Sequence, residues 1–507
     1  MKYSIGVDIG TSGTKTVLFD QYGNKITSST VEYPLHQPKN GYAEQDPNDW
    51  WSATVKTISD VVTNSAVAPC DIVGIGLSGQ MHGLVMLDED NKVIRPSIIW
   101  CDQRTGAECA DIERLVGKER LIQITANPAL TGFTASKIMW VKKHEPENYS
   151  KARHILLPKD YVRFMLTGQY ATEVSDASGM QLLDVPNRCW SDEVLQKLDI
   201  DKGLLGKVYE SAQITGYVTK EAARLTGLCQ GTPVVGGAGD NAAAAVGMGV
   251  VRNGRTFTTV GTSGVVFAHT DDIVIDPKGR VHTFCCAVPN AWHIMGVTQA
   301  AGLSLRWLRD TVCTSEIAQA QQEDVDPYVI MDEEALTSPI GANKLLYLPY
   351  LMGERTPHLD PNARGCFVGL SAIHNRGDLI RSVMEGVAYS LKDCLGVFDE
   401  MDVAYNNMYL CGGGARSSVW RRMLADVFEV PCSRTLSDEG PALGVAILAL
   451  VGAGVYDNVP DACDAIVKTK DTVENHQRNS ADYKKYYNIY KELYGQLKPA
   501  FDALASL

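Results

Sequence analysis

Short apolar runs alternate with amphipathic stretches along the whole chain, and this pattern predicts a fold built from strands and helices. Tyr3–Ile9 and Thr16–Phe19 are expected to form two strands, and Asp46 begins an amphipathic helix that extends to about Ser65. Asp71–Ser78 is rich in residues favoured in strands and is too short for a helix. Because helices flank this run, we expect a mainly parallel sheet with ligand crevices at the carboxyl ends of its strands.

A loop of Gly, Thr and Ser joins the first two predicted strands. Gly10 and Gly13 are expected to supply the left-handed conformations that such a turn needs. The hydroxyl and amide groups between them form a donor-rich concavity suited to anions, and the carboxylate of Asp8 stands beside it. A cation between the two would explain this arrangement, and phosphate with magnesium fits best. The alternative is an ordinary β-hairpin in which Asp8 caps its own turn.

The same pattern returns about half a chain later. Residues 256–267 again give a strand, the sequence Gly261-Thr262-Ser263-Gly264 and a second strand. Two hairpins with the same turn favour phosphate binding and indicate a duplicated domain that holds one ligand from both sides. The 507 residues are enough for two domains with their own cores. We place the first domain at residues 1–246 and the second at residues 247–507.

Composition narrows the class of protein. A formal net charge of −13 and the lack of any long basic run argue against a nucleic-acid surface. The apolar run Gly440–Tyr456 carries no charged residue and falls short of the roughly 20 residues of a membrane span, so we expect a buried helix there and no membrane segment. The 13 cysteines lack metal-ligand spacing and are expected to be reduced thiols of a cytoplasmic protein.

Polar loops follow several of the predicted strands. His82 lies in the loop after Asp71–Ser78, where a substrate would be bound, although a structural histidine satisfied by the backbone is the alternative. Asp240 follows a strand with several glycines and precedes an Ala-rich helix. It is either the N-cap of that helix or a carboxylate that reaches a substrate hydroxyl. Gly412–Gly414 leads into a helix and suits close approach to adenosine or phosphate, with a tight turn as the alternative.

Four further charged residues are expected to be ordinary solvated or ion-paired groups at the surface. They are Asp102, Lys159, Asp160 and Asp176.

Taken in order, these motifs resemble the FGGY carbohydrate kinases, which belong to the superfamily of sugar kinases, actin and heat-shock chaperone ATPases. The motifs are the Asp8 hairpin, Gln80–Gly83, Gly239–Asn241, Gly261–Gly264 and Gly412–Ala415, and Gly132–Trp140 and Gly365–Glu385 are similar to the two signatures of the family. The resemblance extends nearly end to end. It implies an α/β fold of two ribonuclease-H-like domains with a central cleft, in which the first domain mainly holds sugar and the second mainly holds ATP.

Within this family the chain is most similar to the xylulokinases, because of Met81-His82, Trp100–Arg104 and Leu157–Tyr161. This implies ATP-dependent phosphorylation of D-xylulose to D-xylulose 5-phosphate. A kinase for another ketose or polyol, such as ribulose, gluconate or a four-carbon ketose, stays open. Glycerol is disfavoured because glycerol kinases carry an Arg-Glu pair in place of Met81-His82. A non-catalytic sugar or nucleotide sensor is a further alternative.

The resemblance also implies roles for individual residues. Asp240 would act as the general base for the terminal sugar hydroxyl, and Asp8 would lie near the transferring phosphoryl group and hold Mg²⁺ through water. The sugar-binding residues would be Met81, His82, Asp240 and Asn241. The ATP-binding residues would be Thr11, Gly261, Thr262, Gly302, Gly413, Gly414 and Ser418. The expected partners are a small-molecule sugar and ATP, with neither nucleic acid nor membrane, and a homodimer is among the alternatives for the oligomeric state.

Overall fold

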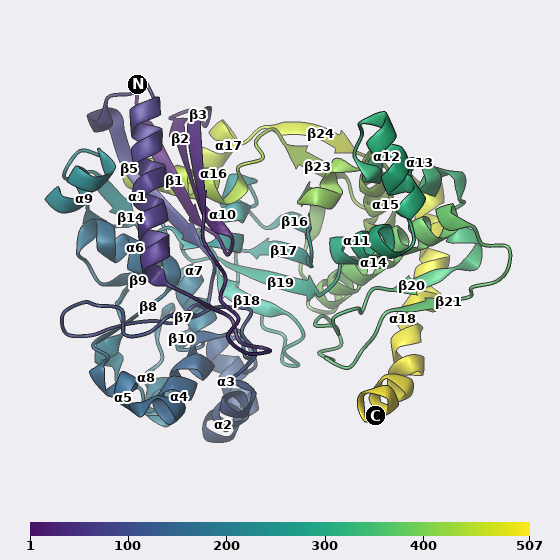
Figure 1. Cartoon of the computed structure of the whole chain (residues 1–507), viewed down its shortest axis with the longest axis horizontal. Coiled ribbons are helices and arrows are strands. Elements are labelled where there is room, and N and C mark those ends of the chain that lie inside the picture. Colours follow the sequence, from purple (N-terminus) through teal and green to yellow (C-terminus); the bar gives the residue numbers. More distant parts are fainter.

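A computed structural model describes all residues from Met1 to Leu507 and forms two lobes, each built on a seven-stranded sheet (Figure 1). The strands of the first sheet are β1 (Tyr3–Ile9), β2 (Gly13–Asp20), β3 (Lys25–Glu32), β5 (Ile72–Gly79), β13 (Ile214–Tyr217), β14 (Pro233–Val235) and β15 (Ala238–Gly239). The strands of the second sheet are β16 (Gly254–Val260), β17 (Gly264–Thr270), β18 (His282–Cys285), β19 (Trp292–Thr298), β22 (Tyr405–Cys411), β23 (Cys432–Thr435) and β24 (Thr469–Val473).

The helices cover the sheets and fill the space between the shorter strands. Those encoded before residue 250 are α1 (Pro47–Asn64), α2 (Gly106–Val116), α3 (Lys118–Thr125), α4 (Thr134–His144), α5 (Pro146–Lys151), α6 (Pro158–Thr167), α7 (Val174–Ala177), α8 (Asp192–Leu198), α9 (Lys220–Thr226) and α10 (Asp240–Gly247). The later ones are α11 (Gly302–Thr311), α12 (Thr314–Glu323), α13 (Pro327–Thr337), α14 (Arg376–Glu400), α15 (Ser418–Phe428), α16 (Gly440–Gly452), α17 (Val459–Ile466) and α18 (Gln477–Ala505). None of them combines the length and the apolar character needed to cross a membrane.

The two sheets share one topology. The order β3-β2-β1-β5-β14-β13 in the first sheet corresponds to β19-β17-β16-β22-β23-β24 in the second. In both, a central antiparallel hairpin is followed by a parallel strand, a second parallel strand and an antiparallel edge strand. This correspondence confirms the duplication expected from the two hairpins. The sheets are mixed, however, so the prediction of a mainly parallel sheet is wrong, because short hairpin turns can only join antiparallel strands.

The first hairpin has the predicted strands but a different turn conformation. The backbone amide of Gly10 donates to the carbonyl of Gly13 at 3.0 Å, and neither glycine has a positive φ. The left-handed conformations expected there are therefore wrong. Close packing explains one of the two glycines, since a Cβ at Gly13 would lie 2.7 Å from the carbonyl oxygen of Val31 on β3.

Helix α16 comes from the second half of the chain but packs on the first sheet, next to α10 (Figure 1). Its backbone touches β1 and β5 at glycines. A Cβ at Gly6 would lie 1.9 Å from the carbonyl oxygen of Ala442, and a Cβ at Gly76 would lie 2.0 Å from that of Val445. The helix is buried, as its long uncharged run predicted. Through this packing, a helix from the second half of the chain becomes part of the first lobe.

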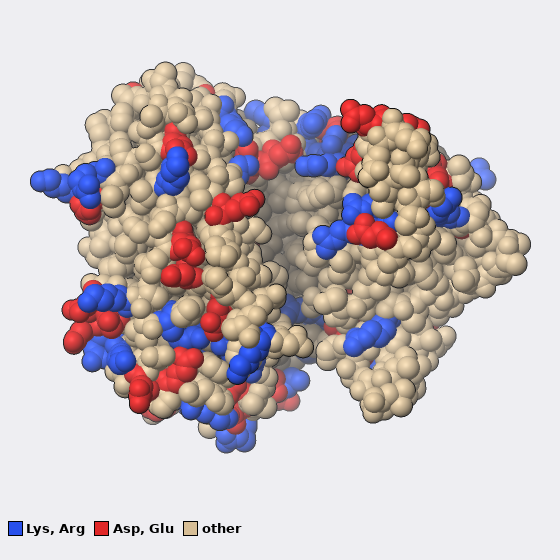
Figure 2. All heavy atoms as spheres, viewed as in Figure 1, with Lys and Arg blue, Asp and Glu red and all other residues tan.

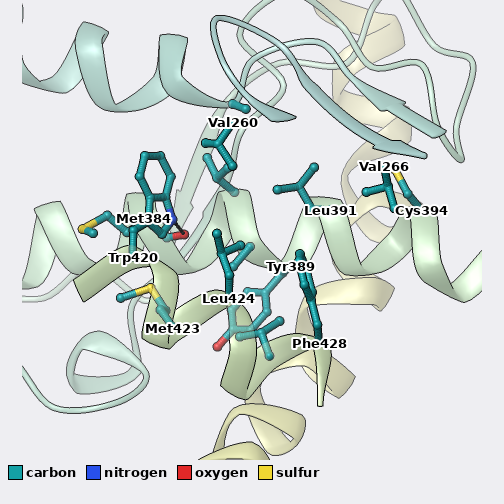
Figure 3. Packing of buried hydrophobic residues seen from close by; sticks show 14 of the residues in the cluster. Val260, Val266, Met384, Tyr389, Leu391, Cys394, Trp420, Met423, Leu424 and Phe428 are labelled. Carbon is teal, nitrogen blue, oxygen red and sulfur yellow. Dashed lines mark hydrogen bonds between the residues drawn. The ribbon is translucent and has the colours of Figure 1, made fainter. Parts of the chain in front are cut away.

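Helices α14 and α15 form the core of the second lobe against β16 and β17 (Figure 3). The indole Nε1 of Trp420 donates to the carbonyl oxygen of Met384 at 3.0 Å, and Leu424 packs beside it. This contact holds the N-terminus of α15 next to the loop Gly412–Gly414.

One pair of cysteines differs from the expectation of reduced thiols. Cys70 and Cys229 form a disulfide with a Cα–Cα distance of 5.4 Å, whereas the other cysteines are free. A sequence separation of 159 residues hides this pairing, because only the folded sheet brings the two segments together.

Candidate active site

The two lobes face each other across a groove, with acidic and basic side chains along both rims (Figure 2). In the first lobe, Asp8 and Asp240 both lie at the carboxyl ends of strands of the sheet. Ser78 of β5 pairs with Asp8 on one side and with Ala238 of β15 on the other, and both pairings are parallel. Asp240 follows β15 directly. Since neighbouring strands are about 4.8 Å apart, the two strand ends that carry the carboxylates are about 10 Å apart.

Asp240 is the first residue of α10, and Gly239 takes the N-cap position. The alternative reading of Asp240 as the N-cap is therefore wrong. Its Oδ1 accepts hydrogen bonds from the backbone amide and from Nδ2 of Asn241, at 2.7 and 2.9 Å. Burial and the negative charge of Asp8 raise the pKa of Asp240 to about 7. A carboxylate with this pKa can both take up and release a proton near neutral pH.

The carboxylate of Asp8 has fewer hydrogen bonds within the chain than that of Asp240. Its Oδ1 is buried and has no hydrogen-bond partner. Burial raises the pKa of Asp8, and the hydroxyl of Ser78 and the charge of Lys15 partly oppose this effect. Lys15 stands opposite Asp8 on β2 and forms an ion pair with Glu439, which precedes α16. The site around Asp8 thus already contains residues from both halves of the chain.

Met81 and His82 lie in the loop after β5, and Met81 packs against Gly239, the residue before Asp240. A Cβ at Gly239 would lie 2.9 Å from Cγ of Met81. Nδ1 of His82 lies 2.8 Å from the carbonyl oxygen of Gly179, so Nδ1 carries the proton and Nε2 is left as an acceptor. Burial and the nearby Lys137 lower the pKa of His82 to about 3, which keeps the ring neutral. The backbone therefore satisfies one ring nitrogen, and the other has no partner within the chain.

A cavity of about 420 Å³ lies in the second lobe. Five of its lining residues are sequence-predicted site residues, namely Gly261, Thr262, Gly302, Gly413 and Gly414. Others were not predicted and include Arg306, Tyr328, Asp332, Arg416, Ser417 and Trp420. Ser418 does not line the cavity, although its neighbour Ser417 does. Thr11 lies in the first-lobe hairpin turn, where its hydroxyl accepts a hydrogen bond from Nε1 of Trp100 at 2.9 Å.

Glycines shape this cavity for different reasons. The amide of Gly302 donates to the carbonyl oxygen of Gly261 at 2.7 Å, and a Cβ at Gly302 would lie 2.5 Å from that oxygen. Gly412 has a φ of +82°, a conformation that favours glycine. Gly413 has no neighbour within 4 Å of a Cβ position, so it leaves open space for a ligand.

The expectation that Lys159, Asp160 and Asp176 lie at the surface is wrong. Their exposed fractions are 0%, 1% and 0%, and Nζ of Lys159 lies 2.8 Å from Asp160 Oδ1 and 3.4 Å from Asp176 Oδ2. Asp102 is also fully buried, and Arg104 pairs with it. Whether such pairs are buried depends on the elements that pack around them, so the local pattern could not predict it.

The buried cluster supports the backbone that precedes Asp240. The carboxylate of Glu173 caps α7 through the amides of Ser175 and Asp176, and it also accepts from the Ser175 hydroxyl at 2.9 Å. That hydroxyl in turn accepts from the amide of Gly239 at 3.1 Å. Sequence analysis missed this chain of hydrogen bonds because Glu173, the last residue of β9 (Ala171–Glu173), and Gly239 of β15 lie far apart in the sequence.

Comparison with known proteins agrees with this geometry. Residues 3–247 match the N-terminal domain of the FGGY family of carbohydrate kinases, and residues 257–453 match the C-terminal domain. The chain belongs to the FGGY family of carbohydrate kinases. It is thus an ATP-dependent sugar kinase, and its two lobes have the actin- and hexokinase-like fold that the sequence predicted.

Individual FGGY kinases are similar over the whole length. The chain is 39% identical to the xylulose kinase of Bacillus subtilis (strain 168) over 506 residues, which is 100% of this chain and 99% of the relative. The crystal structure of a ligand-bound xylulose kinase from Lactobacillus acidophilus matches with a TM-score of 0.92 and 28% identity, over 99% of this chain and 100% of the other. A gluconokinase of Bacillus licheniformis is 31% identical over 506 residues, covering 99% of this chain and 98% of the relative.

Proposed function

We propose that this kinase transfers the γ-phosphoryl group of ATP to the terminal hydroxyl of D-xylulose and forms D-xylulose 5-phosphate. One observation is the main support for this proposal. Asp8 and Asp240 lie on either side of β5, at the carboxyl ends of the strands, and the loop that follows β5 contains Met81 and His82. The similarity to xylulose kinases supports the choice of sugar.

Asp240 would accept the proton of the attacking hydroxyl. Its pKa of about 7 suits a general base near neutral pH. Asn241 holds the carboxylate by two hydrogen bonds, and the free Nε2 of His82 can accept a hydrogen bond from another sugar hydroxyl. These contacts would orient the hydroxyl for in-line attack, which is the main requirement of phosphoryl transfer.

ATP would occupy the cavity of the second lobe. Gly413 and Gly414 would lie along the adenosine, and Gly261, Thr262 and Gly302 would approach the phosphates. Thr11 would contact the phosphates from the first-lobe hairpin, and Ser418 would lie near the adenosine. We therefore assign sugar binding mainly to residues 1–246 and ATP binding mainly to residues 247–507.

The residues around Asp8 fit a magnesium ion. Its buried Oδ1 has no partner within the chain, and a carboxylate oxygen is a preferred ligand of Mg²⁺. No group of three or more His, Cys, Asp or Glu side chains could hold a metal alone, so Asp8 would bind the ion through water and ATP would supply further oxygens. Bound there, Mg²⁺ would neutralise charge on the phosphates during transfer.

A coupled assay of ADP release tests the proposal with D-xylulose, D-ribulose, D-gluconate, xylitol and glycerol as acceptors. We expect a kcat/KM for D-xylulose far above the values for the other acceptors. Gluconate is the second candidate, because of the similarity to a gluconokinase. A highest kcat/KM for gluconate would replace D-xylulose as the substrate, and no ADP release with any acceptor would contradict the proposed function.

A further inference from the structure

Arg355 lies in a loop that follows β20 (Leu346–Leu348) and is held firmly by β19. The buried carboxylate of Glu354 accepts from the hydroxyl of Thr298 at 2.7 Å, from the amide of Gln299 at 3.0 Å and from the amide of Arg355 itself at 2.7 Å. The amide of Thr356 donates to the carbonyl oxygen of Val297 at 2.9 Å. The backbone of Arg355 is therefore fixed, and the acid next to it in sequence is already occupied.

The guanidinium group of Arg355 has no acidic partner within 4.0 Å. By contrast, Arg104 is paired with Asp102 and Arg163 is paired with Asp160. Burial lowers the pKa of Arg355. Arg355 is half-buried, and a partly desolvated guanidinium group without an acidic partner has N–H donors left to satisfy, so a ligand that supplies oxygen acceptors would be bound favourably at this point.

The one side chain that hydrogen-bonds to this guanidinium is His282 on β18. Nδ1 of His282 lies 2.8 Å from Oδ1 of Asn127, whose Nδ2 donates to the carbonyl oxygens of Thr125 and Thr283. Because Oδ1 of Asn127 can only accept, Nδ1 of His282 carries the proton and Nε2 accepts from Nη1 of Arg355 at 3.5 Å. Burial and the charge of Arg355 keep the pKa of His282 well below its usual value, so the ring stays neutral.

This arrangement places Arg355 near His82, which we assign to the sugar site. The ring of Phe133 lies 5.7 Å from that of His282 and 4.8 Å from that of His82, between centroids. The charge of Arg355 contributes to the lowered pKa of His82, whereas the charge that raises the pKa of Asp240 comes from Asp8. From Gly239, which packs against Met81, the site continues through His82, Phe133 and His282 to Arg355.

We propose that Arg355 binds the end of the acceptor opposite the hydroxyl that is phosphorylated. Its free N–H groups would donate to the carbonyl oxygen of a ketose and, by the same chemistry, to the carboxylate of an aldonate, which a guanidinium group can bind with two hydrogen bonds. Arg355 would then favour acceptors with a carbonyl or carboxylate over alditols of the same length. This inference rests on the proposed function, because it takes Asp240 as the point where the terminal hydroxyl is activated.

The test compares Arg355→Met with the wild-type enzyme, using D-xylulose, D-gluconate and xylitol. Binding of each acceptor is measured by calorimetry without ATP, and kcat and KM are measured for each acceptor that reacts. A hydrogen bond to a charged group contributes roughly 1.5–3 kcal/mol, so we expect the affinity for D-xylulose to fall about 10- to 100-fold. The loss should appear mainly in KM, binding of D-gluconate should fall at least as much, and binding of xylitol should change less than about threefold.

Two further variants serve as controls. Arg355→Lys keeps the charge and should bind D-xylulose more tightly than Arg355→Met does. If Arg355→Met folds poorly, Arg355→Lys is compared with the wild-type enzyme instead, and its affinity for D-xylulose should be reduced more than its affinity for xylitol. Arg364→Met changes an exposed arginine of the same region whose side chain bonds only to backbone carbonyls, so it should bind all three acceptors normally. If Arg355→Met lost equal affinity for D-xylulose and xylitol, or kept its affinity for D-xylulose, the inference about Arg355 would be overturned and the proposed function would stand. A wild-type enzyme that phosphorylates none of the acceptors would instead overturn the proposed function on which the inference rests.

Discussion

Asp8 and Asp240 lie on either side of β5, since Asp8 pairs with Ser78 and Asp240 follows β15, whose Ala238 pairs with the same serine, and the charge of Asp8 raises the pKa of Asp240. The two residues are far apart in sequence, and both stand at carboxyl ends of parallel strands in one sheet. Oδ1 of Asp8 has no hydrogen-bond partner within the chain, whereas the pKa of Asp240 lets it exchange a proton near neutral pH. These two environments suit an enzyme in which one carboxylate lies near a phosphate group and the other takes a proton from a sugar hydroxyl.

Replacement of Asp240 should abolish most turnover without preventing substrate binding. General-base assistance typically contributes about 10²–10⁴-fold, so we expect kcat of Asp240→Ala to fall by about that factor. D-xylulose and ATP should still bind in part, as measured by calorimetry. Asp90→Asn, which changes an exposed acid in a surface turn, should keep the wild-type kcat. A near-wild-type kcat in Asp240→Ala would remove Asp240 from the role of base.

The activity should rise with pH on the acidic side. Because Asp240 must be ionised to accept a proton and its pKa is about 7, kcat/KM should be half-maximal near pH 7 and lower below it. Asp8→Asn removes the charge that raises this pKa, so the acidic limb of its residual activity should move to lower pH. A pH profile of both enzymes measures the shift. An unchanged midpoint in Asp8→Asn would contradict the electrostatic coupling.

Adding a methyl group at Gly413 should weaken ATP binding without disturbing the fold. Gly413 lines the cavity of the second lobe, and a Cβ there meets no atom within 4 Å, so alanine would project into space that we assign to ATP. We expect a higher KM for ATP, an unchanged KM for D-xylulose and an unchanged Tm. Gly495→Ala is the matched control, since that glycine is equally open but lies on α18. Normal ATP binding by Gly413→Ala would contradict the assignment of this cavity.

Close packing between α16 and β1 should make Gly6 intolerant of a side chain. A Cβ at Gly6 would lie 1.9 Å from a backbone oxygen of Ala442, and backbone atoms cannot move aside as a flexible side chain can. Overpacking of this kind typically costs about 1–3 kcal/mol, so Gly6→Ala should lower the Tm measured by calorimetry. Gly454→Ser, at a site without neighbours within 4 Å, tests instead the cost of its positive φ. An unchanged Tm in Gly6→Ala would show that α16 can move away from the sheet.

The sequence alone predicted much of the architecture. The helix expected from Asp46 to about Ser65 is α1, which Asp46 and Ser65 cap, and the two Gly-Thr-Ser-Gly hairpins correctly indicated a duplicated fold. Residues within one motif carry their own local signal, because periodicity and turn composition depend on neighbours in the chain. The same local reasoning failed at Lys159 and Asp176, which looked like surface charges and are buried.

What the sequence by itself determined is the order of strands, turns and helices, and the residues that stand at strand ends. Only the tertiary structure decided that α16 crosses to the first lobe, that Cys70 reaches Cys229, and that Arg355 lies against His282 without an acidic partner. The physical reason is that burial and pairing depend on how separate segments of the chain pack against one another. Their free energies belong to the packed structure, whereas helix and strand preferences are already present in short stretches of chain.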